Sequence, residues 1–159
     1  MDRKVVPIDL AFKRSDTTRT LREALAEHRA HIPGLVETPD DPVDPLDVLF
    51  TGHDVVHCLF GLGTTTAEEV RVDAYSVIAT SLSFPRYLAY VSHPAVSKVI
   101  RETTTLATLP HIGISILRNP VIWWRTRRMK RWDFDGWNAH MDRRLVDIRA
   151  DYGIRVDSA

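Results

Sequence analysis

Residues 52–57, Gly-His-Asp-Val-Val-His, decide how the rest of the chain is interpreted. On a helix, the imidazoles of His53 and His57 lie about 40° apart on successive turns, and Asp54 falls within the same arc. Three metal-capable side chains on an otherwise apolar, buried helix are unfavourable unless a partner compensates them, and a divalent metal ion is the simplest partner. The stretch therefore predicts a metal site. The apolar residues of this helix are Val48, Leu49, Val55, Val56, Leu59 and Phe60.

Glu69 supplies a fourth donor from the next predicted helix. The stretch Gly61-Leu62-Gly63 can end the first helix in a left-handed cap, and residues 64–66, three threonines, offer a cap for the second. Such a tight reversal makes the two helices antiparallel and returns Glu69 to the level of the histidines. Two imidazoles with one or two carboxylates are a common zinc donor set, which iron(II) and manganese(II) also accept.

Each donor also has a simpler interpretation. A His-x-x-x-His pair on a helix can be incidental. Glu69 can complete a capping box begun by Thr66. Asp54 can orient the imidazole of its neighbour without touching a metal. The four residues together favour metal binding, because four polar residues at fixed spacing match one pattern.

That pattern resembles the signature of the coenzyme Q (ubiquinone) biosynthesis protein Coq-four family, in which these four positions are zinc ligands. The resemblance covers residues 50–82. It extends more loosely to residues 148–154, Ile-Arg-Ala-Asp-Tyr-Gly-Ile, which are similar to the family's closing helix. It implies that zinc is held by His53, Asp54, His57 and Glu69.

The resemblance also implies a function. Members of the family bind polyprenylated quinone-head precursors and act at the ring, with oxidative decarboxylation at the carbon that bears the carboxylate. They associate with other enzymes of the pathway and with a membrane surface. A zinc ion in this site could polarise a ring carboxylate or phenolate as a Lewis acid. A relative that acts on another aromatic metabolite would show the same ligands.

Composition limits the other classes of function. At 159 residues, 44% hydrophobic and 26% charged, the chain has the size and composition of one globular domain. Its formal net charge is zero, which makes nucleic acid an unlikely partner. A single cysteine, Cys58, excludes an internal disulfide and fits a reducing compartment. No run approaches about 18 apolar residues, so we expect no membrane span. We expect a cytoplasmic location, and a homo-oligomer is compatible with the sequence.

The apolar periodicity predicts an all-α, single-domain bundle of about six to eight helices, with the metal site between two antiparallel ones. Residues 1–15 are expected to form an irregular arm and residues 16–155 the domain. Helices are predicted from about residue 16 to Pro33 and at 45–60, 67–82 and 135–152. Residues 84–102 are expected to form one helix, or two broken at Pro94, with Tyr87 and Tyr90 among the packing residues. Residues 103–118 form an interrupted apolar segment.

Asp73 follows Glu69 at helical spacing. Ser76 and Thr80 continue the same line. If Glu69 faces a metal, Asp73 and Ser76 should line the cavity beside it, and Asp73 becomes the candidate acid or base. The alternative is a solvated stripe with Glu69 turned outward.

Between Arg118 and Arg131, cationic residues alternate with tryptophan. This composition suits the headgroup level of an anionic membrane, the phosphate of a prenyl ligand, or RNA; it also suits a basic face covered by acidic residues. We expect peripheral membrane contact through Trp123, Trp124, Arg125, Arg127 and Arg128.

Three functions remain open from the sequence. The first is a zinc-dependent enzyme acting on an aromatic or prenylated carboxylate. The second is a non-catalytic lipid-binding or scaffold protein with a structural zinc, which four protein ligands would favour. The third is a His-Asp metal phosphohydrolase with His28 or His31 upstream and Asp133 or Asp135 downstream as additional ligands. It ranks last because it leaves His57 and Glu69 without a role. Outside this alternative, His28 and His31 are expected to face solvent at the end of the first helix.

Overall fold

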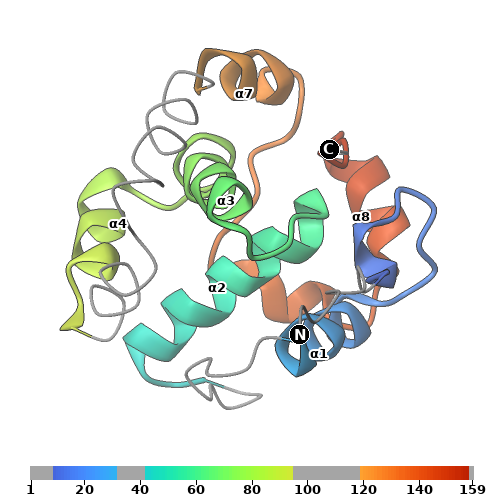
Figure 1. The fold of residues 1–159 in the computed structure, drawn as a ribbon, viewed down its shortest axis with the longest axis horizontal. Coiled ribbons are helices and arrows are strands. Elements are labelled where there is room, and N and C mark those ends of the chain that lie inside the picture. The colour runs from blue at the N-terminus through green and yellow to red at the C-terminus, as the bar shows by residue number, and fades with distance from the viewer. Residues whose placement is uncertain (1–8, 32–41, 95–118, 158–159) are drawn as a thin grey trace, which may run out of the picture.

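The computed structural model describes residues 9–31, 42–94 and 119–157. These residues form an all-α structure with six α-helices and no strand, as the sequence predicts (Figure 1). The predicted helical segments after Pro94 and at 103–118 lie outside the described residues. In chain order the elements are η1 (Ala11–Lys13), α1 (Leu21–Ala30), α2 (Pro45–Phe60), α3 (Thr66–Ala79), α4 (Phe84–Val91), α7 (Asn119–Thr126), η2 (Gly136–His140) and α8 (Leu145–Tyr152).

Helix α2 runs through the middle of the fold and contacts both α1 and α3 (Figure 1). Asp44 caps its start by accepting a hydrogen bond from the Leu46 amide, and Pro45 occupies the first turn, where no amide donor is needed. Gly61 ends the helix with φ 69°, a left-handed conformation that glycine adopts without strain. Most of the helix is buried, so its few polar side chains lie among packed neighbours.

A buried arginine completes the C-terminus of α2. The last carbonyls of a helix have no partner within it. The guanidinium of Arg149, on α8, donates to the carbonyls of Cys58 and Leu59 at 2.8 and 2.9 Å, and also to those of Phe12 and Arg14 at 2.6 and 2.7 Å. One side chain thereby joins α2, α8 and the segment around η1.

The N-terminal segment is partly built into this core. Of the predicted arm, residues 9–15 are described; Ala11–Lys13 form the turn η1, and Phe12 is fully buried. Helix α1 begins at Leu21, later than predicted, because Thr20 and Glu23 form the capping box that starts it.

The C-terminal region also differs from the prediction. The single helix expected from about residue 135 is divided into η2 and α8. Arg144 between them is extended because the chain pairs there with the start of α1: the Leu145 amide donates to the Arg19 carbonyl at 2.8 Å, and the Arg22 amide to the Met141 carbonyl at 2.9 Å. Tertiary pairing thus overrides local helix propensity.

Trp132 and Trp137, which follow the basic stretch in sequence, belong to the core and are 1% exposed. Phe134, between them, lies against α2 at Gly52, where an added Cβ would come within 2.5 Å of its ring. Glycine therefore permits this close approach one residue before His53. Within the described part of the chain, no helix is both long and apolar enough to cross a membrane.

Candidate metal centre

Helices α2 and α3 place two histidines opposite two carboxylates. The Nε2 atom of His57 lies 3.5 Å from Oε2 of Glu69, and Nε2 of His53 lies 3.4 Å from Oδ1 of Asp73. Both pairs fit one antiparallel register of the two helices. The two histidines are four residues apart on α2, and the two acids are four residues apart on α3. The tight turn after Gly61 produces this register, as the sequence predicts.

Three of the four predicted metal ligands converge. One ligand atom from each of His53, His57 and Glu69 lies within 4.8 Å of the others. Two donors bound to one tetrahedral zinc at bonds of about 2.0–2.1 Å are roughly 3.4 Å apart. The 3.5 Å and 3.9 Å separations between Glu69 Oε2 and the two histidine nitrogens are close to this value. The donor set and its spacing could therefore hold a divalent metal ion, zinc, iron(II) or manganese(II) among them.

The backbone orients His57 for this role. Its Nδ1 lies 3.3 Å from the Leu62 carbonyl, an acceptor, so Nδ1 carries the hydrogen. Nε2 is then the nitrogen that faces Glu69: when protonated it donates to the Glu69 carboxylate, and when deprotonated it offers its lone pair to a metal ion. Charge acts in the same direction on Glu69: burial raises the pKa of its carboxyl, but the hydrogen bond and charge of His57, with the charge of His53, outweigh burial and lower it.

The start of α3 leaves Glu69 available. The capping box there is formed by Thr65 and Glu68, with both reciprocal hydrogen bonds present. The alternative in which Thr66 and Glu69 form the box is wrong. Glu68 also binds Lys13 at 2.7 Å and the Gly63 amide at 2.9 Å, so the two adjacent glutamates have separate tasks.

Asp73 lies beside His53, as predicted for a cavity-lining acid. Burial lowers the pKa of His53, but the hydrogen bond to Asp73 and the charges of Glu69 and Asp73 outweigh it and raise that pKa to about 9. A metal ion must therefore displace a firmly held proton from His53. Ser76 and Thr80 are buried, and the Thr80 hydroxyl donates to the Ser76 carbonyl, so the predicted polar line enters the core beyond Asp73.

Two tyrosines of α4 form a further side of the site. The ring of Tyr90 lies 5.4 Å from that of His53, tilted by 31°. Burial, followed by the charge of Asp73, raises the pKa of both Tyr87 and Tyr90. The sequence indicated these residues only as packing candidates. Their spacing of three on a helix that directly follows α3 is the signal that could have placed both rings at the site.

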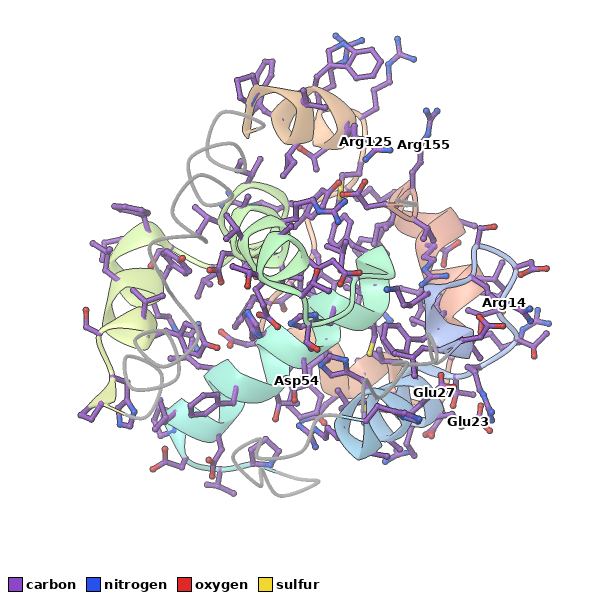
Figure 2. All side chains as sticks on the ribbon, in the orientation of Figure 1. Arg14, Glu23, Glu27, Asp54, Arg125 and Arg155 are labelled. Carbon is purple, nitrogen blue, oxygen red and sulfur yellow. The ribbon has the colours of Figure 1, made fainter. Side chains whose placement is uncertain are left out.

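The structure does not bring Asp54 into the group of three donors. Its Oδ2 accepts a hydrogen bond from Nε of Arg29 at 3.0 Å, and its Oδ1 lies 3.8 Å from Nε2 of His28 (Figure 2). Both partners belong to α1. Asp54 is thus directed toward α1, and it is not part of the group that includes Glu69.

His28 was expected to be solvent-facing and is instead buried. It is 2% exposed, its ring lies 4.6 Å from that of His57, and its Nε2 has no hydrogen-bond partner among the described residues. His31, expected to face solvent, is exposed. The sequence missed His28 because its burial depends on how α1 packs against α2.

The burial of His28 leads to a pH-dependence. Burial, followed by the charges of His57 and His53, lowers its pKa to about 2, whereas the unfolded chain protonates it near 6.5. A lowered histidine pKa means that stability is lost as pH falls below the unfolded value. We expect the metal-free protein to lose about 1 kcal/mol of unfolding free energy per pH unit between about pH 6.5 and 5.

Urea denaturation across this range measures the slope, with His28→Asn as the variant and His31→Asn as the control. His53 contributes little to the slope, because its folded form stays protonated and its unfolded form is mostly protonated below about pH 6. A slope unchanged in His28→Asn would contradict the assignment.

The two acids that the phosphohydrolase alternative would add as ligands pair with other residues. Asp133 accepts from the Ser81 hydroxyl at 3.2 Å, and Asp135 forms a bidentate pair with Arg86 at 2.6 and 2.9 Å. Neither acid belongs to the three-donor group.

In comparisons with known proteins, no family model, curated protein or solved structure matches the chain. The resemblance on residues 50–82 therefore remains a prediction, and the properties of the site are those of its own geometry.

Proposed function

We propose that this protein is a zinc-dependent enzyme of quinone or related aromatic metabolite biosynthesis that acts on a ring carboxylate. The observation that carries the proposal is the convergence of His53, His57 and Glu69, whose ligand atoms lie within 4.8 Å of one another. Catalytic zinc sites typically have three protein ligands and one position for water or substrate, whereas structural sites have four. Three converging donors favour the catalytic class.

When bound, the metal would supply Lewis-acid polarisation of a carboxylate or phenolate oxygen. The remaining tasks belong to the chain. Asp73, at 3.4 Å from His53, holds or moves a proton at Oδ1. In the proposed reaction the bond between ring and carboxylate breaks, carbon dioxide leaves, and a proton takes its place on the ring carbon.

The test uses zinc-loaded protein and a para-hydroxybenzoate that carries a short prenyl chain and an isotopically labelled carboxylate. We expect labelled carbon dioxide and the decarboxylated ring to appear together, and Asp73→Asn to slow both without removing zinc. If removing zinc unfolds the protein and no such turnover is found with a series of aromatic carboxylates, the metal is structural. The scaffold or lipid-binding function then replaces the enzyme.

We also propose that α7 contacts an anionic membrane surface. Val121, Trp123 and Trp124 are 54%, 63% and 56% exposed, and α7 lies at the edge of the fold beside α3 (Figure 1). Arg127 stacks over the Trp124 ring at 4.8 Å, and Arg128 is also exposed. Tryptophan and arginine together suit the headgroup level of a bilayer.

Arg125 differs from the other predicted contact residues. Its guanidinium pairs with the buried carboxylate of Asp157, which also lies 3.3 Å from Arg71 (Figure 2). The charge of Arg125 is therefore compensated within the fold, so it is expected to contribute little to a membrane contact.

Sedimentation with vesicles tests this surface. We expect binding to vesicles containing phosphatidylglycerol and little binding to pure phosphatidylcholine, with the double variant Trp123→Ala/Trp124→Ala reducing binding by about tenfold or more. Arg125→Gln is the matched control and should bind as the unaltered protein does. Binding to single-stranded RNA in preference to anionic vesicles would contradict the assignment. Association with other biosynthetic enzymes or with a second copy remains a prediction.

A further inference from the structure

We infer that Arg29 determines the ligand set of the metal site by holding Asp54 away from it, so that three protein donors and one exchangeable position remain. This inference rests on the proposed metal site and adds to it a residue from a different helix. Arg29 acts through Asp54 and is a positioning residue.

Both oxygens of Asp54 are directed to α1. Oδ2 accepts a hydrogen bond from Arg29 Nε at 3.0 Å, and Oδ1 faces His28 Nε2 at 3.8 Å. A carboxylate that is 5% exposed needs such a partner, because an unpaired buried charge is strongly unfavourable. The hydrogen bond to Oδ2 therefore holds Asp54 toward α1, and Asp54 is not among the three donors that converge.

Arg29 is itself fixed in place. Another nitrogen of its guanidinium, Nη2, donates to the hydroxyl of Thr51 at 3.0 Å. Thr51 lies about one turn before Asp54 on α2. The planar guanidinium therefore bonds two residues of α2 at once, which fixes its orientation as a single contact would not. Lysine has the charge but not this two-sided geometry.

The consequence concerns what the metal can bind. With Asp54 retained by Arg29, the donors are His53, His57 and Glu69, and the fourth position is open to a small anion. If Arg29 is removed, the buried carboxylate of Asp54 loses its hydrogen-bond partner. The metal ion of the site is then the nearest cation that can replace the guanidinium. The open position then closes.

Zinc affinity gives the first test, by competition with a chelator. We expect the dissociation constant of Asp54→Asn to stay within about threefold of that of the unaltered protein, since asparagine can still accept from Arg29. Glu69→Gln should weaken zinc by about tenfold to a hundredfold. A loss of tenfold or more in Asp54→Asn would overturn the inference.

Cobalt substitution gives the second test. The visible absorption of the cobalt protein should change on titration with thiocyanate, which reports an exchangeable position. In Arg29→Met that response should be lost, and the additional change Asp54→Asn should restore it. No thiocyanate response in the unaltered protein, or a retained response in Arg29→Met, overturns the inference.

The outcomes separate this inference from the proposed function. If the unaltered protein binds neither zinc nor cobalt, the metal site itself is refuted. If it binds metal but Asp54→Asn does not, the metal site stands and the role of Arg29 fails. Because Asp54→Asn retains an acceptor for Arg29, the first test does not depend on the folding of Arg29→Met.

Discussion

Replacing Arg149 by methionine is expected to lower the free energy of unfolding by about 3–5 kcal/mol, the largest effect on stability predicted for any single residue here. Arg149 is 4% exposed, and its guanidinium donates to four carbonyls from two separate segments, the one around η1 and the end of α2. Methionine matches the length of the stem but leaves those carbonyls, including the last turn of α2, without a donor. His57 lies in that turn, so the change should also weaken metal binding.

Urea denaturation at neutral pH measures this effect in the metal-free protein. Arg149→Lys should be intermediate, because it keeps the charge but reaches fewer acceptors. Arg144→Met is the matched control: this exposed arginine, at the start of the same helix, pairs only with Asp147, so its loss should cost less than about 1 kcal/mol. Equal losses in Arg149→Met and Arg144→Met would contradict the role given to Arg149.

Replacing His57 by alanine is expected to weaken zinc binding by about a hundredfold or more. His57 offers Nε2 to the site at 3.5 Å from Glu69, and its Nδ1 is already committed to the Leu62 carbonyl. No water can restore both the direction and the basicity of this donor within a buried position. The three-donor set would be reduced to two.

Chelator competition measures the affinity, and circular dichroism of the metal-free variant checks that the helices persist. His31→Ala is the control, because His31 is exposed and contacts only the Glu27 carbonyl, at 2.8 Å, so its zinc affinity should be unchanged. Full zinc affinity in His57→Ala would remove the histidine pair from the site and favour the phosphohydrolase alternative.

The features of this fold that are local in sequence were predictable. The spacing of His53 and His57 depends only on helical geometry, and the reversal at Gly61 depends on its freedom to adopt positive φ. Together they place Glu69 opposite the histidines without reference to any other segment. The all-α class followed from the same periodicity.

Features that depend on distant contacts were not predictable. Asp54 lies next to His53 in sequence, but its direction is set by Arg29 on α1, 25 residues away. The burial of His28 has the same cause. Arg149 resembles any other arginine of a C-terminal helix until its acceptors, 90 or more residues earlier, are known.

The tryptophans after the basic stretch illustrate the same limit. Trp123 and Trp124 are exposed, whereas Trp132 and Trp137 are buried. Trp124 and Trp132 each stand next to an arginine in the sequence, so composition cannot separate these two. The difference arises because the backbone near Trp132 pairs with the end of α3 through the Ala79 carbonyl and the Ser81 amide.

The central claim is that His53, His57 and Glu69 bind one metal ion. Elemental analysis of the purified protein beside Glu69→Ala tests it most directly. The account predicts about one zinc per chain in the unaltered protein and little in the variant, with both remaining helical. The absence of bound metal in the unaltered protein after incubation with zinc, iron(II) or manganese(II), or equal metal in both proteins, would contradict it.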